Sequence, residues 1–470
     1  MKKKKFRLVD AVLATVCITL VAESVMPTAA IGNSQYFWWL FLIIAFCVPY
    51  GMIAAELSTT YPSEAGLYDW VKRAFGAKWA GRVAWNYWVN FPLWISSLAT
   101  AITTILAGLL GFELSWLIVL AIQLVYIWLV TFLGTKRVGE SKYIVNLGTI
   151  FKVVLLAGIG LLGIYYYTKN GSANPITSFK DLLPDLSLNI DSGLPFISII
   201  IFNFLGFEVV GSFVGDMENP NKDIPKALII GGLLMAIFYI LPATGFNIVL
   251  GGSDVDPSDI VAVLTGLFES IGLSGSALSA LLWVAGIMFI YTFIANIASW
   301  SFGVNEVAKY AADDGSMPAI FKGTNEEGCA ANASIMNGVV ASIISIAGIV
   351  VAEFFADFQD AFALFFCLSW ITLLFSYAPM FLAFLKLRKD DPDTKRVYRV
   401  PGGKVAEKLF GYVPFIFLIL GLAFTIFGDF TLEYVKDNIP LLVGVALSFI
   451  IEEILVARIK PEKKTKKGKK

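Results

Sequence analysis

The sequence contains no histidine, and this absence removes several kinds of site at once. Without an imidazole there is no Ser-His-Asp or Cys-His nucleophile, no histidine metal ligand and no histidine-based pH switch. The cysteines are few and far apart, at Cys17, Cys47, Cys329 and Cys367, with neither disulfide nor metal spacing. These gaps disfavour a membrane-embedded enzyme, and we expect no cofactor and no metal site.

Charged residues are also scarce. They make up 15% of the 470 residues, whereas hydrophobic residues make up 57%; soluble domains average about 25% charged. The apolar residues fall in runs of about 20, each long enough to cross the hydrocarbon core as a helix. They do not form the short alternating segments of a membrane barrel. The composition therefore predicts an all-α integral membrane protein without a separate soluble domain.

Apolar windows predict twelve membrane crossings. They cover residues 9–31, 36–57, 82–110, 114–133, 143–168, 193–214, 226–250, 275–310, 334–353, 361–385, 409–428 and 437–457. An even number of crossings places both termini on the same side of the membrane. A basic segment, residues 1–8, precedes the first crossing, and a basic tail, residues 458–470, follows the last.

The basic residues are distributed unevenly between the two sides. Lys169, Lys180 and Lys436 fall on one side, Lys152 lies within a crossing, and all other Lys and Arg residues flank the opposite side. The positive-inside rule makes that opposite side cytoplasmic. We therefore expect a multi-pass plasma-membrane protein, bacterial by its lysine-rich ends, with both termini in the cytoplasm. The basic tail would lie near anionic lipid, and no nucleic-acid partner is expected.

The N-terminus permits a second interpretation. MKKKKFR, an apolar stretch and PTAA also resemble a secretory signal peptide, whose removal would leave eleven crossings and discard Glu23. Glu23 and Pro27 interrupt the apolar region and argue against this, and the lysine cluster is equally natural as a cytoplasmic anchor.

Two crossings carry helix-breaking and polar residues near mid-depth. The first contains Glu23, Ser24 and Pro27, and the sixth contains the run FNFLGFEVVG, residues 202–211. Proline and glycine loosen a helix at such a point. Two breaks five crossings apart predict a five-plus-five inverted repeat, 9–168 and 193–385, followed by 409–457.

The breaks can also be purely structural, since glycine and proline are common in membrane helices. A carboxylate at mid-membrane, however, costs roughly 2.5 to 3.5 kcal/mol on insertion scales. Glu23 and Glu208 in the two interrupted crossings are hard to explain as packing, so the pattern favours a binding site.

Two motifs resemble the amino acid, polyamine and organocation transporter superfamily. They are GFEVVGSFVGDMENPNKDIPKA, beginning at Gly206, and WSFGVNEVAKYAADDGSMPAIF, beginning at Trp300. The resemblance extends over the first ten crossings and is nearest to bacterial exchangers of amino acids and amines. It implies a LeuT-like fold, alternating access, and a central site between crossings 1, 3, 6, 8 and 10.

The sequence departs from that family at the first break. Members that carry amino acids usually have a glycine-serine-glycine type segment there, whose bare backbone donors receive the substrate carboxylate. This chain instead has Ala22, Glu23 and Ser24. Glu23 would repel a carboxylate in a poorly hydrated pocket, whereas an amine or guanidinium would bind it by a charge-assisted hydrogen bond. The departure therefore predicts a substrate without a carboxylate.

The resemblance also assigns roles elsewhere. Trp300 matches a tryptophan that stacks on the guanidinium group in the arginine and agmatine exchanger, and Phe202 matches an aromatic that closes over the substrate. Lys152 resembles the lysine that replaces a sodium ion in sodium-independent relatives; snorkelling to the interface is the alternative. The assigned binding set is Ala22, Glu23, Ser24, Asn90, Trp94, Phe202, Asn203, Glu208 and Trp300. For the aromatic and polar members, ordinary packing stays open as an alternative.

The sequence therefore predicts a secondary transporter that exchanges small cationic amines such as agmatine and putrescine. Glu23 and Glu208 would repel each other in an empty site, and a diamine would relieve that repulsion. An amino acid permease or an amino acid/amine antiporter, with or without proton coupling, is the alternative. A receptor would bind its ligand without counterflow of a second substrate. A channel is disfavoured because the sequence contains no evident pore or filter segment. We expect a monomer or homodimer in the lipid bilayer. We expect one group of charged residues to form ion pairs of an inner gate or to lie in solvated loops: Asp69, Arg73, Arg82, Asp216, Glu218, Asp313 and Asp314.

Overall fold

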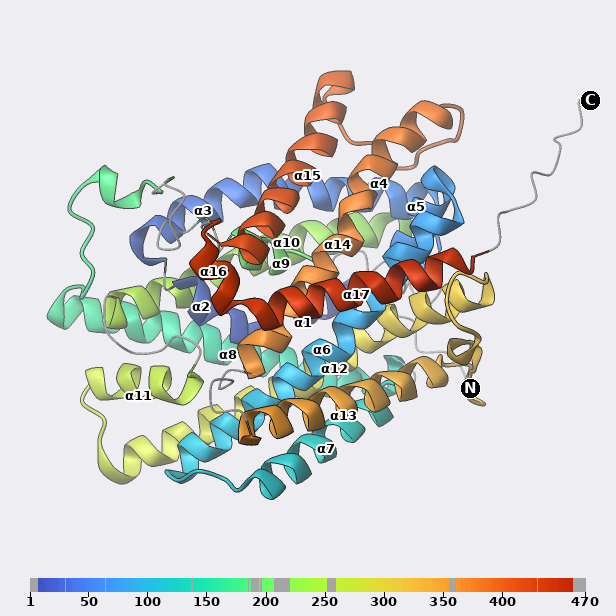
Figure 1. The fold of residues 1–470 in the computed structure, drawn as a ribbon. Helices are drawn as coiled ribbons and strands as arrows, with labels where there is room; N and C mark the ends of the chain where they lie inside the picture. The colour runs from blue at the N-terminus through green and yellow to red at the C-terminus, as the bar shows by residue number, and fades with distance from the viewer. Residues whose placement is uncertain are drawn as a thin grey trace, which may run out of the picture.

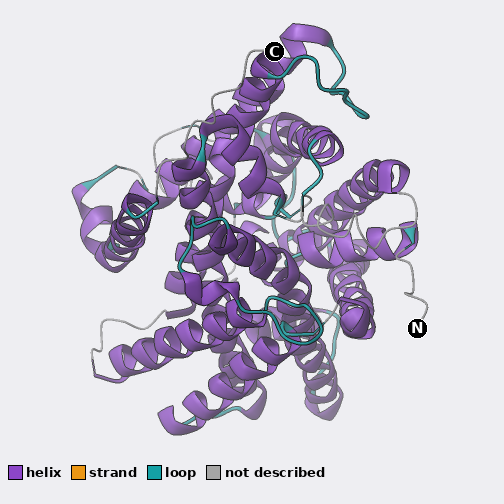
Figure 2. Cartoon of the chain, turned by 90° about the vertical axis from the view of Figure 1, so that its right-hand side faces the viewer, coloured by secondary structure: helices purple, strands orange, loops and turns teal. Residues whose placement is uncertain are grey.

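The computed structural model describes most of the chain as helices joined by short connections. The described residues are 7–29, 31–63, 65–136, 138–184, 186, 194, 197–206, 220–251, 259–354, 361–428 and 430–459. They contain no strand (Figure 2). The all-α prediction is confirmed for this part of the chain.

Seventeen α-helices are described (Figure 1). They are α1 (Leu8–Thr19), α2 (Val25–Ala29), α3 (Gln35–Leu42), α4 (Val48–Thr60), α5 (Gly66–Phe75), α6 (Ala77–Leu110), α7 (Trp116–Leu133), α8 (Val138–Asn170), α9 (Ile197–Phe202), α10 (Pro220–Leu250), α11 (Ile260–Ser270), α12 (Gly275–Asp313), α13 (Ala331–Phe354), α14 (Ala361–Asp390), α15 (Gly403–Phe427), α16 (Leu432–Asp437) and α17 (Ile439–Ala457).

Ten helical stretches among the described residues are long and apolar enough to cross a membrane. One of them, Gly32–Thr60, joins α3 to α4 through a π-helical turn at Ile43–Cys47. Together the ten account for ten of the twelve predicted windows. In the two remaining windows, 9–31 and 193–214, the described residues form the short helices α1, α2 and α9, and the chain leaves α-helical geometry after Thr19 and after Phe202.

The short helix α1 lies among three long ones. It contacts α8, α10 and α12, while α6 packs against α12 and α14 on the other side of the bundle (Figure 1). Small residues permit close approach: a Cβ on Gly148 of α8 would lie 2.2 Å from Ala295 of α12, and one on Gly163 would lie 2.2 Å from Gly245 of α10. Such small-residue contacts are how membrane helices associate without a hydrophobic driving force. They hold α8 against both neighbours of the interrupted segment.

Polar contacts join several connecting segments at one end of the bundle. Tyr61, after α4, donates to Asp391, after α14, at 2.9 Å. Lys72 of α5 pairs with Asp314, after α12, at 2.7 Å. Helix α5 therefore lies against the ends of α12 and α14.

Four of the residues expected in an inner gate make other contacts, and Asp216 and Glu218 lie outside the described residues. Arg73 pairs with Asp69, four residues away on α5, and Arg82 pairs with Glu453 of α17, both at 2.7 Å. Asp313 pairs with Lys309 within α12. These contacts lie within one helix or join α6 to α17, so Lys72–Asp314 is the ion pair of this group that ties α5 to α12.

Candidate functional site

The helix of the first crossing ends at Thr19 and resumes as a 3₁₀ turn at Ala22–Ser24. At this break the Tyr239 hydroxyl of α10 accepts a hydrogen bond from the Val21 N–H and donates one to the Thr19 carbonyl, both at 2.8 Å. A backbone break inside a membrane protein is tolerated only where protein groups or water satisfy the freed donors and acceptors. Tyr239 therefore holds the two sides of the break together.

Glu23 lies in this 3₁₀ turn and is only 4% exposed. Its Oε1 accepts a hydrogen bond from the indole Nε1 of Trp94 in α6 at 3.2 Å. Within the described part of the chain, no Lys or Arg side chain forms an ion pair with it. A buried carboxylate without an ion-pair partner is costly, and a cationic ligand in contact with it relieves that cost.

Aromatic rings border the Glu23–Trp94 pair. The ring centroids of Trp94 and Trp300 are 5.8 Å apart, and those of Trp94 and Phe202 are 6.1 Å apart, each pair at an interplanar angle of 85°. Trp300 is fixed by a 2.8 Å hydrogen bond from its Nε1 to the carbonyl of Ile18, in the last turn of α1. The structure thus brings three predicted aromatic residues, from α6, α9 and α12, into one cluster beside the carboxylate.

The second interruption lies against the first. Helix α9 ends at Phe202, and the Ser24 hydroxyl donates to Asn203 Oδ1 at 2.6 Å and to the Val21 carbonyl at 2.7 Å. Among the described residues Asn203 Nδ2 has no hydrogen-bond partner, although it is buried. Two segments that are 179 residues apart in sequence therefore meet through polar side chains, as the two-break interpretation requires.

Gly206 shows why this segment needs a glycine. Its φ is +112°, and a Cβ there would lie 2.9 Å from both the Trp300 ring and Ile18. Its N–H donates to the Tyr50 hydroxyl of α4 at 3.2 Å. The missing side chain allows the backbone to approach Trp300 closely.

Lys152 is fully buried in α8, 1% exposed, and does not reach a membrane surface. Its ammonium group donates to the carbonyls of Cys17, at 2.6 Å, and Leu20, and to Asn296 Oδ1 of α12 at 3.0 Å. The alternative, in which the Lys152 side chain snorkels to the membrane interface, is therefore excluded. The ammonium satisfies carbonyl oxygens that the end of α1 would otherwise leave unpaired.

The other predicted residues are less closely joined. Ala22 is fully buried in the 3₁₀ turn. Asn90 is also buried, but its amide donates to the Tyr87 carbonyl of its own helix, and it makes no hydrogen bond to another candidate residue in the described ranges. Glu208 lies outside the described residues, so its opposition to Glu23 stays a prediction.

The sequence did not lead us to three residues that contact the site: Tyr239, Tyr50 and Asn296. Each is a polar group within an apolar window, which was the available signal. Their windows were not interrupted, however, and polar side chains in membrane helices often hydrogen-bond only to their own turn. Their partners lie in distant segments that only the folded chain brings near.

The family described as amino acid permease matches residues 6–449. The chain belongs to this family. It is therefore a membrane transporter of the amino acid, polyamine and organocation superfamily, and the predicted resemblance is confirmed.

Individual relatives extend the comparison. The chain is 40% identical to the "Probable agmatine/putrescine antiporter AguD" of Lactococcus lactis subsp. lactis, over 97% of this chain and 95% of that protein. It is 25% identical to the "Lysine-specific permease LysP" of Lactococcus lactis subsp. cremoris, over 84% and 77% of the two chains. It is 24% identical to a probable polyamine transporter of Arabidopsis thaliana, over 88% and 78%.

Proposed function

We propose that this transporter exchanges small cationic amines, agmatine for putrescine or a related diamine, by alternating access. The observation that carries the proposal is the buried Glu23 carboxylate, which accepts a hydrogen bond from Trp94 and forms no ion pair with a Lys or Arg side chain among the described residues. The name of the 40% identical relative, a probable agmatine/putrescine antiporter, supports the same substrate class.

The site's chemistry suits a cation. An ammonium or guanidinium group would form a charge-assisted hydrogen bond with Glu23, and a cation over the indole face of Trp300 gains about 2 kcal/mol when desolvated. An α-carboxylate at the same place would meet a like charge in a medium of low dielectric. We therefore assign Ala22, Glu23, Ser24, Asn90, Trp94, Phe202, Asn203, Glu208 and Trp300 to the binding region.

Asn203 adds a polar contact to this site. If its amide is rotated by 180°, Nδ2 donates to the Ser24 hydroxyl, and Ser24 keeps its donation to the Val21 carbonyl. Asn203 Oδ1 then becomes a free acceptor for a substrate ammonium. This arrangement would satisfy the buried amide nitrogen, which otherwise has no partner in the described structure.

Exchange follows from the charge of the empty site. With Glu23 unpaired, and with Glu208 proposed as a second acid, the empty transporter would carry buried negative charge during reorientation. A loaded transporter would not. Reorientation with a dication bound is then favoured over return of the empty site, which makes influx of one amine depend on efflux of another.

The proposed architecture contains twelve crossings in a five-plus-five inverted repeat. Segments 9–168 and 193–385 would be the repeats, 409–457 the last two crossings, and 1–8 and 458–470 cytoplasmic ends. The interruptions after Thr19 and Phe202 support this arrangement because they occur in the first and sixth predicted windows. The protein would function as a monomer or homodimer in the plasma membrane.

Lys152 is proposed as a substitute for a coupling sodium ion. Its ammonium lies among two carbonyl oxygens from the end of α1 and one amide oxygen from α12. Oxygen ligands of this kind suit a hard cation as well as an ammonium donor. A permanent positive charge there would remove the need for sodium.

The test is uptake of labelled agmatine and putrescine into proteoliposomes preloaded with either amine. We expect uptake that depends on preload. Glu23→Gln removes the charge but keeps the shape, and we expect transport to fall about ten- to a hundredfold, since a hydrogen bond to a charged group contributes about 1.5 to 3 kcal/mol. If preloading the proteoliposomes with amine does not stimulate uptake, the proposed exchange is rejected.

Glu113→Gln is the matched control. Glu113 is an exposed carboxylate in the connection before α7, so the same chemical change should leave transport unaltered. Equal loss of transport in both variants would show that Glu23 has no specific role, and thermal stability of the purified variants separates loss of function from loss of folding.

An amino acid permease, or an amino acid/amine antiporter with or without proton coupling, is the second candidate. In its present orientation Asn203 Nδ2 is a buried donor without an acceptor, which is what a substrate carboxylate would need. Competition distinguishes the candidates: zwitterionic amino acids would inhibit labelled-amine uptake under the second candidate and would not under the first.

A further inference from the structure

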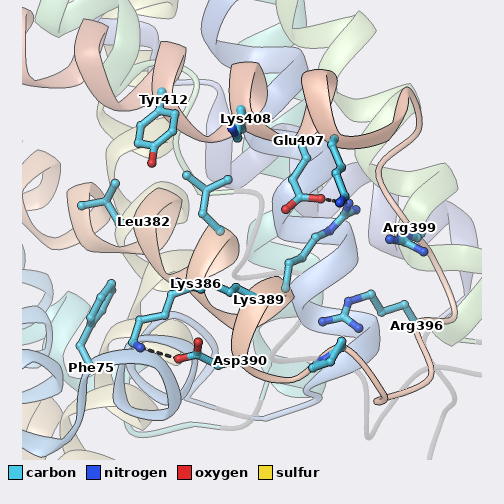
Figure 3. Close-up of a pocket in the computed structure, with 14 residues that line it drawn as sticks. Phe75, Leu382, Lys386, Lys389, Asp390, Arg396, Arg399, Glu407, Lys408 and Tyr412 are labelled. Atoms are coloured by element: carbon cyan, nitrogen blue, oxygen red, sulfur yellow. Dashed lines mark hydrogen bonds and ion pairs between the residues drawn. The ribbon is translucent and has the colours of Figure 1, made fainter.

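A separate pocket of about 800 Å³ opens where the C-terminal end of α14 faces the N-terminal half of α15 (Figure 3). Seven basic side chains line it, against two acidic ones. It shares no residue with the candidate amine site. Its charge also has the opposite sign, so the cationic substrate proposed above does not fit it.

Four of the basic groups carry uncompensated charge. Lys389, Arg399, Lys404 and Lys408 are exposed and have no ion-pair partner in the described structure. Figure 3 shows Lys389 from α14, Arg399 from the connection after it and Lys408 from α15 around the same opening, and Lys404 of α15 also lines it. Like charges gathered in this way repel one another, and an anion bound between them relieves that repulsion.

The pocket is held open by buried contacts beneath it. Glu56 of α4, 1% exposed, accepts hydrogen bonds from Arg388 and from the Val400 N–H, the latter at 2.7 Å, and pairs with Arg396 at 3.2 Å. These contacts tie the connection between α14 and α15 to a third helix. The backbone of this connection, which carries Arg399, is therefore positioned before any ligand binds.

Apolar surface continues from the pocket along the membrane-facing side. Leu382, Leu385 and Tyr412 also line it. Next to Tyr412, Gly411 lets the two helices touch, because a Cβ there would lie 2.6 Å from Leu385. Along α15, exposed Leu409, Tyr412 and Ile416 follow at helical spacing. A ligand that fits both parts has a compact anionic head and an apolar tail.

We propose that this pocket binds the phosphate headgroup of an anionic phospholipid, with the acyl chains lying along α15. The phosphate would accept hydrogen bonds from the four unpaired basic groups, and the chains would cover the apolar row. Basic pockets at the ends of membrane helices bind such headgroups. A soluble phosphate shares the headgroup chemistry but leaves the apolar surface uncovered. The proposal is independent of amine exchange.

Native mass spectrometry of the purified full-length protein tests the proposal with three probes: phosphatidylglycerol, phosphatidylcholine with the same acyl chains, and inorganic phosphate. We expect retention of phosphatidylglycerol over phosphatidylcholine. Each lysine near an anionic surface contributes about fivefold in affinity, so Lys404→Gln with Lys408→Gln should weaken phosphatidylglycerol binding about 25-fold.

The control pair is Lys322→Gln with Lys395→Gln, two exposed lysines that do not line the pocket. It removes the same net charge, so phosphatidylglycerol binding should stay within about twofold of the unmodified protein. Equal weakening by both pairs, or equal retention of the two phospholipids, would overturn the proposal. Displacement of phosphatidylglycerol by millimolar inorganic phosphate would instead assign the pocket to a soluble anion and would also overturn it. The comparison of the two phospholipids needs no variant and stays decisive if a variant fails to fold.

Discussion

At position 152, the lysine ammonium is bound by oxygens from two other helices instead of reaching a membrane surface. The carbonyls of Cys17 and Leu20 and the amide oxygen of Asn296 are its acceptors. A buried ammonium persists only if its hydrogen bonds and charge are satisfied. The residue therefore links α8 to the end of α1 and to α12, next to the break that contains Glu23.

Lys152→Ala should abolish most sodium-independent exchange, because it leaves three oxygens in the membrane interior without a donor. If the ammonium replaces a sodium ion, added sodium should restore part of the exchange in this variant, and potassium or choline should not. Amine uptake into proteoliposomes, measured across these salts, checks the prediction.

Lys136→Ala is the control for this experiment. Lys136 is partly exposed and pairs with Glu327 at 3.3 Å, so its loss should cost little and should create no sodium dependence. Loss of transport in Lys152→Ala with no response to sodium would contradict the role as a sodium substitute.

At the scale of a helix, the interruption of the first crossing depends on support from α10. Tyr239 accepts from Val21 and donates to Thr19, and its ring stacks on Trp39 with centroids 5.0 Å apart. The broken segment is thus held in one geometry by a neighbouring helix. The sequence of the first crossing explains why its helix is interrupted, but the residue that stabilises the interruption, Tyr239, comes from α10.

Tyr239→Phe should destabilise the protein by about 1 to 3 kcal/mol for each backbone group left unpaired. We expect a lower thermal midpoint together with weaker amine binding, because Glu23 lies two residues beyond Val21. Thermal unfolding of the detergent-purified protein, followed with and without agmatine, provides the measurement.

Tyr126→Phe is matched to it, because the buried Tyr126 hydroxyl of α7 has no hydrogen-bond partner among the described residues. Removing that hydroxyl should leave the thermal midpoint nearly unchanged. If the two variants had the same midpoint, the bridge at Tyr239 would have no energetic role.

At the scale of the whole molecule, α5 closes one end of the bundle against α12. Lys72 pairs with Asp314, and the Tyr68 hydroxyl donates to Asp314 and is hydrogen-bonded to the Ser316 hydroxyl at 2.8 Å. Burial and the neighbouring Asp314 carboxylate raise the pKa of Tyr68, so its hydroxyl stays protonated and remains a donor. This contact joins segments from both proposed repeats.

Asp314→Asn should open this end more often. A partly exposed ion pair contributes about 0.2 to 1 kcal/mol, so the open population should rise up to about fivefold. Distances between spin labels on α5 and on the segment after α12 report that population. Asp313→Asn removes a pair internal to α12 and should not change the distances. A shift of similar size in both variants would contradict the closing role.

Sequence and structure agree most closely on the long helices. Ten predicted windows correspond to continuous spanning helices in the described chain, because twenty apolar residues in lipid have few alternatives to a helix. The breaks near Glu23 and Asn203 were also predictable, since Pro27, Gly206 and the polar groups disrupt helical geometry locally. The position of Glu208, outside the described residues, is the part of the site left as a prediction.

The amino-acid sequence by itself determined the membrane class, the helical content, the family and the acidic character of the first break, because composition, run length and motifs are local properties of the chain. Only the tertiary structure decided which groups meet: Trp94 with Glu23, Tyr239 across the break, Lys152 with the carbonyls of α1, and the basic pocket between α14 and α15. These contacts join residues far apart in the chain, and the packing of several helices sets them together.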